Sequence, residues 1–296
     1  MTIAIYGSRH QHDHVDSIIS FLGGLVKESH RLVLHKKIAD YLAERCPLEA
    51  LAISESSTIV STPEFAADVA VSIGGDGTFL RTAQWVSDKE IPIIGVNTGH
   101  LGFLAPFTLA EARAELESFI HGRSLIDERS LLQVNSPELP ADAWPYALNE
   151  VAILKKDSAS MIEITTSLER LPIADYLCDG LIVSTPTGST GYNLSAGGPV
   201  VDPASPVLIL SPVAAHSLTM RPLVIPDSHY LTFKVTCRHP QFRLSLDGRS
   251  YNFSCGHTFY VSKAPFAVRY IVKSQFAFYN TIREKLLWGT TPRRTS

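Results

Sequence analysis

The sequence predicts two domains, a parallel α/β domain followed by a mostly antiparallel all-β domain. Up to about residue 104, short apolar runs alternate with amphipathic segments, the order that builds a parallel sheet covered by helices. From about residue 124, short extended runs follow one another with Pro, Gly and Asp turns between them, as in antiparallel sheets. The length of 296 residues and the 45% hydrophobic content give each domain enough material for its own core.

The spacing of apolar residues predicts the elements of the α/β domain. One helix face is marked at helical spacing by Val15, Ile18, Ile19, Leu22 and Val26. The runs short and apolar enough for buried strands are Ile3 to Tyr6, Arg31 to His35, Val69 to Ile73 and Ile91 to Val96. Further helices are expected over Lys36 to Arg45, from Thr78 onward with Phe79, Ala83 and Val86 on one face, and over about Ala110 to Ile120.

Eight short runs predict the strands of the all-β domain: LLQV (131–134), YALNEVAIL (146–154), MIEITTSL (161–168), LIVST (181–185), VLILS (207–211), YLTFKV (230–235), FRLSLDG (242–248) and HTFYVS (257–262). A helix is expected again over 276–288, with Phe278, Ile282 and Leu286 facing inward. We place the α/β domain at residues 1–104, completed by the carboxy-terminal helix within 276–296, and the all-β domain at residues 105–275.

Composition excludes several classes of protein. The formal net charge of -3 shows no basic excess, so a nucleic-acid partner is not expected. The amino terminus has neither the pattern of a signal peptide nor that of a membrane span, which predicts a cytoplasmic protein with no membrane partner. The 4 cysteines form no Cys-x-x-Cys pair, so they are expected to be reduced thiols without a metal.

The stretch VSIGGDGTFLRTAQW (71–85) reads as strand, glycine turn and helix. Such a turn brings backbone N–H groups close to a phosphate, because glycine has no Cβ and the following helix begins with its positive dipole end. A carboxylate would hinder plain phosphate binding, so Asp76 is expected to meet a hydroxyl group or a metal ion beside the phosphate. Asp and Gly are also common in turns without function, and that alternative stays open for this stretch taken alone.

Familiar catalytic motifs are absent from the sequence. It contains no Gly-Lys dipeptide for a Walker A loop and no His-Glu-x-x-His, and Leu80 replaces the third glycine of Gly-x-Gly-x-x-Gly. Thr187 stands where the hydrolase elbow Gly-x-Ser-x-Gly requires its first glycine. These absences argue against hydride transfer, P-loop phosphotransfer and esterase chemistry.

Two stretches of the all-β domain carry binding chemistry. In LNEV (148–151), Asn149 and Glu150 interrupt an apolar run and suit recognition of a ribose diol, because a carboxylate accepts hydroxyl protons. The run DGLIVSTPTGSTGYNLSAGGPV (179–200) is dense in hydroxyls and glycines that suit phosphate oxygens, and Tyr192 could stack on a heteroaromatic ring.

Several polar residues keep two readings. His10, His12 and His14 alternate in a loop, where solvated histidines are expected rather than a metal site because no matching Cys or carboxylate cluster accompanies them. His100, His216 and Asp247 are candidates for either ligand contact or local structure. Arg81 lies one helical turn beyond Gly77, so it could reach a phosphate or belong to a solvated face.

Six stretches together resemble the bacterial NAD kinases: GGDGT (74–78), NTGHLGF (97–103), LNE (148–150), DGLIVSTPTGSTGYNLSAGGP (179–199), HSLTMRP (216–222) and SLDG (245–248). GGDGT is shared with diacylglycerol kinases, sphingosine kinases and phosphofructokinases. The long run that begins at Asp179 is much more specific to the NAD kinases. The resemblance implies a Rossmann-like amino-terminal domain, a β-sandwich carboxy-terminal domain that binds the dinucleotide, and a homodimer or homotetramer. It also implies transfer of the γ-phosphate of ATP, with Mg²⁺, to the 2'-hydroxyl of the adenosine ribose of NAD.

Carried over residue by residue, the resemblance makes Asp76 the catalytic residue and assigns no residue to a metal. The substrate-binding set is Asp76, Gly77, Arg81, Asn149, Glu150, Asp179, Thr187, Thr190, Gly191, Tyr192, Asn193, Leu194, Ser195, Ala214 and Arg249. The sequence departs from the family pattern at Leu177, Ala215 and Arg249, where some or many relatives have arginine, proline and glutamine. Two other functions stay open: a lipid or sphingoid kinase that shares GGDGT, and a dinucleotide-binding regulator without catalysis.

Overall fold

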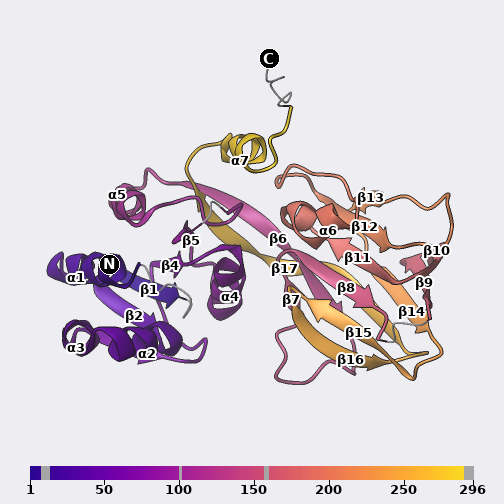
Figure 1. Cartoon of the computed structure of the whole chain (residues 1–296), viewed down its shortest axis with the longest axis horizontal. Helices are drawn as coiled ribbons and strands as arrows, with labels where there is room; N and C mark the ends of the chain where they lie inside the picture. Colours follow the sequence, from indigo (N-terminus) through magenta and orange to yellow (C-terminus); the bar gives the residue numbers. More distant parts are fainter. Residues whose placement is uncertain (8–13, 100–101, 157–159, 290–296) are drawn as a thin grey trace, which may run out of the picture. The chain divides into compact units, whose positions relative to one another are not determined.

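The computed structural model describes residues 1–7, 14–99, 102–156 and 160–289, and Figure 1 traces the chain. The chain forms two compact units: unit 1 is Met1–Glu128 with Val268–Ser296, and unit 2 is Arg129–Ala267. No helix in the described ranges combines the length and the apolar character needed to cross a membrane. The hypotheses for His10, His12 and His100 fall outside the described residues.

Unit 1 contains a parallel sheet whose strands lie in the order β3 (Ser57–Val60), β2 (Arg31–His35), β1 (Thr2–Gly7), β4 (Val69–Ile73) and β5 (Ile93–Val96). From β1 the chain first builds outward to β3 and then returns to the other side of β1 with β4. In doubly wound sheets the ligand crevice opens where the strand order reverses, which here is between β1 and β4. The predicted parallel α/β domain is therefore confirmed, and GGDGT follows a strand at the reversal point.

Helices cover both faces of this sheet: α1 (Val15–Lys27), α2 (Lys36–Arg45), α3 (Pro47–Glu55), α4 (Asp76–Val86) and α5 (Leu109–Ile120). Alternate strand residues such as Ile3, Ile5 and Val71 share one core with α1, α2, α3 and α5. Helix α4 instead packs on β1, β4 and β5 through residues outside that core, so it covers the opposite face. Its predicted inner face is confirmed, because Phe79, Ala83 and Val86 are all buried.

The carboxy-terminal residues return to unit 1. Tyr270, near the end of strand β17 (Thr258–Val272), pairs in parallel with Ile93 of β5. Its ring lies edge-on to Phe79 of α4 with the centroids 5.3 Å apart. The last helix, α7 (Ala277–Lys285), buries Ile282, while Phe278 is half-buried. The end of the chain thereby contributes side chains to the unit that carries GGDGT.

Unit 2 is an antiparallel two-sheet sandwich. One sheet has the order β13 (Leu223–Pro226), β12 (Val207–Val213), β11 (Gly180–Ser184), β8 (Glu150–Leu154), β15 (Gln241–Leu246) and β16 (Arg249–Ser254). The other contains β10 (Leu171–Cys178), β9 (Ile162–Leu168), β14 (Leu231–Thr236), the unit 2 part of β17, and β6 (Leu125–Asn135) with β7 (Tyr146–Ala147). Inward residues of both sheets form a single core, which includes the rings of Phe233, Phe242, Phe253 and Phe259. The predicted all-β sandwich is confirmed.

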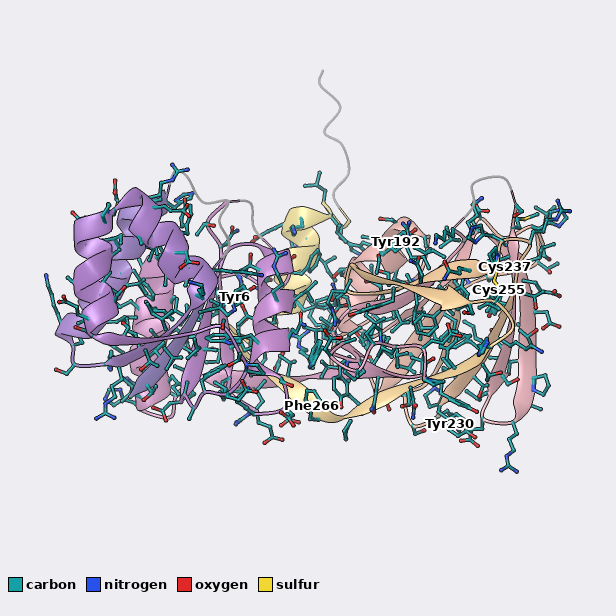
Figure 2. The ribbon with its side chains drawn as sticks, turned by 90° about the horizontal axis from the view of Figure 1, so that it is seen from below. Tyr6, Tyr192, Tyr230, Cys237, Cys255 and Phe266 are labelled. Atoms are coloured by element: carbon teal, nitrogen blue, oxygen red, sulfur yellow. A yellow bond between two sulfur atoms is a disulfide. The ribbon has the colours of Figure 1, made fainter. Side chains whose placement is uncertain are left out.

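Two features of unit 2 differ from the sequence expectations. Cys237 and Cys255 form a disulfide with their Cα atoms 6.2 Å apart, so the expectation of 4 reduced thiols is wrong for this pair; Cys46 and Cys178 are free. Figure 2 shows the bond between the two labelled cysteines. The run YALNEVAIL forms two strands, β7 and β8, rather than one, because Leu148 and Asn149 make a turn between them.

Candidate functional site

The glycine turn of unit 1 places Asp76 at the first position of α4. Strand β4 ends at Ile73, and Gly74 follows with φ +145, a conformation that L residues rarely adopt. A Cβ on Gly74 would lie 2.4 Å from Oγ1 of Thr78, so the turn needs glycine for space as well. Cβ atoms on Gly75 and Gly77 would meet nothing within 4 Å, and no side chain among the described residues caps this helix end, where N–H groups can bind an anion.

Both carboxylate oxygens of Asp76 are held by the loop after β5. The N–H of Phe103 donates to Oδ2 and the N–H of Leu104 donates to Oδ1, each at 2.9 Å. A Cβ on Gly102 would lie 2.0 Å from Oδ1, so the loop can approach the carboxylate only because residue 102 is glycine. Nζ of Lys285 lies 4.0 Å from Oδ2. Asp76 is therefore fixed in orientation while it stays about one-third exposed, at 33%.

Gly102→Ala is expected to lower kcat because the new methyl group must displace the Asp76 carboxylate or the loop that holds it. A misplacement of about 1 Å costs on the order of 10²-fold in rate, so we expect a fall of about that size. Steady-state kinetics of the reaction that the family resemblance implies, formation of NADP from NAD and ATP, would measure it. Gly99→Ala in the same loop is the matched control, because its Cβ would meet nothing within 4 Å. Equal kcat values for the two variants would contradict the prediction.

In unit 2, the turn that carries Asn149 and Glu150 is fastened by Asp247. Asp247 Oδ2 accepts the N–H of Leu148 at 2.7 Å, and Oδ1 accepts the N–H groups of Asn149 and Glu150 at 2.9 and 3.1 Å. Asp247 sits in the two-residue Asp-Gly hairpin between β15 and β16 with φ +47, as a type I′ turn requires. Asp247 was a candidate for either ligand contact or local structure, and these hydrogen bonds support a structural role.

The hydroxyl-rich segment packs against the same turn. Thr185 Oγ1 donates to the carbonyl of Leu148 at 2.6 Å, and the N–H of Gly188 donates to that hydroxyl at 3.0 Å. A Cβ on Gly188 would lie 2.1 Å from the carbonyl oxygen of Asn149. A Cβ on Gly191 would lie 3.1 Å from Oε2 of Glu150. Glycine is therefore needed at residue 188, and Gly191 lets the segment approach the Glu150 carboxyl closely.

The Glu150 carboxyl of this turn has a raised pKa. Burial raises the pKa of its carboxyl to about 7, the nearby Asp247 carboxylate adds to the rise, and the N–H of Tyr192 opposes it. Its Oε2 atom is buried without a hydrogen-bond partner in the protein. A buried acceptor of this kind is costly unless a donor reaches it, and a ligand hydroxyl would supply one. Glu150 is thus suited to bind a hydroxyl group.

The raised pKa of Glu150 predicts how stability depends on pH. Between its ordinary value of 4.5 and about 7, the folded protein keeps a proton that the unfolded chain has lost, so stability falls as pH rises. The size is about 3 kcal/mol, from roughly 1.4 kcal/mol per pKa unit. Urea unfolding from pH 4 to pH 8 should therefore show a loss that is larger in wild type than in Glu150→Gln by about this amount. A Glu163→Gln control on an exposed part of β9 should follow wild type; parallel curves for Glu150→Gln would contradict the prediction.

The remaining residues of the 187–195 segment differ in exposure. Thr187 and Thr190 belong to the 3-10 helix η2 (Thr187–Thr190), where Thr187 is buried and Thr190 half-buried. In the short helix α6 (Tyr192–Ser195), Tyr192 and Ser195 are exposed, Leu194 is half-buried and Asn193 is fully buried. Figure 2 labels Tyr192. The side-chain amide of Asn193 donates to the carbonyls of Ser189 and Pro199 and accepts from Ser211, so these bonds hold the loop together.

Two candidate residues, Asp179 and Ala214, lie away from the Asn149–Glu150 turn, and a third, Arg249, already makes hydrogen bonds within the protein. Gly180 pairs with Leu154 and Ser184 with Glu150, so Asp179 and Ala214 lie at the far end of β11, about 13 Å from the turn at 3.3 Å per residue. Asp179 is paired there with Nζ of Lys155 at 2.6 Å. Arg249 donates to the carbonyls of Trp144 and Tyr146, and its guanidinium stacks 5.0 Å from the Trp144 ring. Arg81, a fourth candidate, belongs to unit 1 and is exposed on α4.

Reasoning from sequence overlooked the residues that hold the two acids in place. Gly102 and Phe103 belong to the motif NTGHLGF, but nothing local in the sequence indicates that their backbone faces Asp76. Lys285 carries no sequence signal that connects it to GGDGT. Within the described residues, no three His, Cys, Asp or Glu side chains gather as a metal cluster.

Comparisons with known proteins identify the family. Residues 10–124 match the ATP-NAD kinase N-terminal domain and residues 148–273 match the ATP-NAD kinase C-terminal domain. NAD kinase from Bacteroides fragilis is 36% identical over 293 residues, 99% of this chain and 100% of that protein. NAD kinase from Porphyromonas gingivalis is 38% identical over 98% of this chain and 99% of that protein.

Solved structures agree with this assignment. An NAD kinase from Archaeoglobus fulgidus in complex with ATP has a TM-score of 0.72 at 26% identity, covering 95% of this chain and 96% of that one. Yeast NADH kinase complexed with NADH shares the fold with a TM-score of 0.88 at 23% identity, covering 100% of this chain and 90% of that one. None of these relatives supports a lipid kinase or a non-catalytic regulator. With two matching domains and relatives aligned over almost its whole length, the chain belongs to the ATP-NAD kinase family.

Proposed function

We propose that this protein is an ATP-dependent NAD kinase, which transfers the γ-phosphate of ATP to the 2'-hydroxyl of the adenosine ribose of NAD to give NADP and ADP. The observation that carries the proposal is Asp76, whose carboxylate is held by two N–H groups beside the open amino-terminal end of α4. This is an acceptor for a hydroxyl proton next to a group of phosphate-binding N–H donors.

In the reaction, the 2'-oxygen of the ribose forms a bond to the γ-phosphorus and the bond from that phosphorus to the oxygen of ADP breaks. Asp76 accepts the proton that the 2'-hydroxyl releases. General-base assistance of this kind contributes about 10²- to 10⁴-fold in rate, and positioning of the two substrates contributes much of the remainder. Gly77 is proposed to contact the dinucleotide through its backbone, where no side chain intervenes.

Binding of the dinucleotide is assigned to the all-β part of the chain, placed by sequence at residues 105–275. Asn149 and Glu150 bind ribose hydroxyls, and the unpartnered Oε2 of Glu150 supports this role. The exposed Tyr192 ring is available for stacking on a heteroaromatic ring. The other proposed contacts are Thr187, Thr190, Gly191, Asn193, Leu194, Ser195, Asp179, Ala214, Arg249 and Arg81.

Mg²⁺ is proposed to enter with ATP. Within the described residues the protein offers no cluster of carboxylate and imidazole ligands, and Mg²⁺ in kinases is commonly held by substrate phosphates with one or two carboxylates. The ion would neutralise charge on the phosphates. We also propose a homodimer or homotetramer located in the cytoplasm; light scattering on the purified protein would test the assembly.

The function is tested by incubating the purified protein with NAD, ATP and Mg²⁺ and measuring NADP with an NADP-specific dehydrogenase. NADP formation that depends on ATP supports the proposal. ATP consumption with a lipid or sphingoid acceptor, but not with NAD, would replace it with the lipid-kinase alternative. NAD binding without turnover would leave a dinucleotide-binding regulator.

A further inference from the structure

The carboxy-terminal helix brings a cation to the GGDGT turn. Lys285 is the last residue of α7, and its Nζ lies 4.0 Å from Oδ2 of Asp76 and 4.8 Å from the centroid of the Phe103 ring. The helix that carries it is anchored in unit 1 by the buried Ile282 and by Phe278, whose ring centroid is 6.4 Å from that of Phe103. Asp76, Phe103 and Lys285 therefore form one cluster of known geometry.

The Asp76 carboxylate does not depend on Lys285 for its hydrogen bonds. Both oxygens of Asp76 already accept a backbone N–H at 2.9 Å, whereas 4.0 Å is too long for a direct hydrogen bond from Lys285. The lysine side chain keeps 31% of its surface exposed, and its ammonium lies near an aromatic ring face that attracts cations. Its three N–H donors are thus available to an anion placed beside Asp76.

Phosphoryl transfer at this turn needs such a charge. The transition state spreads negative charge over the equatorial oxygens of the γ-phosphoryl group, and the Asp76 carboxylate would repel it. Residues 74–78 contribute N–H groups and a helix dipole but contain no cationic side chain themselves, and Arg81, the proposed contact on α4, is exposed. A lysine ammonium on a flexible stem can follow the phosphoryl group as it moves.

We propose that Lys285 is a catalytic residue whose ammonium binds the transferring γ-phosphoryl group of ATP beside Asp76. The inference rests on the proposed ATP-dependent phosphoryl transfer and adds a phosphate ligand from the carboxy-terminal helix. Bond making and breaking are those of the proposed reaction, and Lys285 keeps its proton throughout. Its contribution is the charge that faces the phosphoryl oxygens.

The test compares Lys285→Met, Lys285→Arg and Arg283→Met in the full-length protein. Methionine keeps the length of the side chain and removes the charge, arginine keeps the charge, and Arg283 is exposed in the last turn of the same helix. We expect Lys285→Met to lower kcat by about 10²-fold and to weaken ATP binding by about tenfold, as for loss of a charged phosphate ligand. Lys285→Arg should retain most of kcat, and Arg283→Met should match wild type.

Two further measurements distinguish a catalytic role of Lys285 from a purely structural one. Calorimetry with ATP and Mg²⁺, and separately with NAD, should show weaker nucleotide binding and unchanged NAD binding in Lys285→Met. A lysine that only ties α7 to the loop would lower the melting temperature and weaken both ligands together, and that result overturns the inference. Wild-type values of kcat and of ATP affinity in Lys285→Met also overturn it. If wild type binds ATP but makes no NADP, the NAD kinase proposal fails, while the ATP affinities of the variants still decide the role of Lys285.

Discussion

Asp76→Asn is expected to lower kcat for NADP formation by about 10²- to 10⁴-fold, the usual contribution of a positioned general base. An amide has the size of the carboxylate but cannot accept the proton of the 2'-hydroxyl. Dissociation constants for NAD, measured by calorimetry, should stay within about threefold of wild type, because the dinucleotide contacts assigned to unit 2 are untouched.

This substitution also alters the loop that holds Asp76. Two N–H donors face the two oxygens, so the amide NH₂ must oppose either Phe103 or Leu104. Asp68→Asn is the matched control, because Asp68 likewise accepts a backbone N–H, from Thr2 at 2.7 Å, at the start of β4. A melting temperature should accompany each kcat. Turnover by Asp76→Asn within about threefold of wild type would remove Asp76 from proton transfer.

Asp247→Ala is expected to cost about 4 kcal/mol of unfolding free energy, a large part of the stability of a typical protein. The change leaves three N–H groups of residues 148–150 without their acceptor and places alanine at φ +47. The KM for NAD should rise as well, because the same bonds orient the Asn149 and Glu150 turn.

Urea unfolding measures the stability change, with Asp247→Asn and Asp175→Ala as comparisons. Asparagine accepts the positive φ and keeps one acceptor oxygen, so it should lose less than alanine. Asp175 is exposed on β10, and its replacement should change stability by no more than about 0.5 kcal/mol. A small effect of Asp247→Ala, equal to that of Asp175→Ala, would show that the Asn149–Glu150 turn is stable without the Asp247 hydrogen bonds.

Much of unit 1 could be predicted because its signals are local. A buried strand of a parallel sheet is a short continuous apolar run, and a covering helix repeats its apolar residues every three or four positions. The strands Arg31–His35 and Val69–Ile73 and the helix Lys36–Arg45 have the predicted bounds. Elements without such a pattern were missed: α3, β3, β10, β13 and β16. Strand β3, for example, has no fully buried residue, so its four positions show no alternation of buried and exposed side chains.

The sequence by itself determined the fold class, the family and the two acidic motifs, because each depends on residues that are neighbours in the chain. The tertiary structure decided what surrounds those acids. Asp247 lies in the hairpin turn between β15 and β16, whereas Glu150 begins β8, and Lys285 lies near Asp76 at the end of the last helix. No spacing rule predicts such contacts, since they arise only when sheets and helices pack. The orientation of Asp76, the raised pKa of Glu150 and the cation beside the glycine turn are therefore properties of the folded chain.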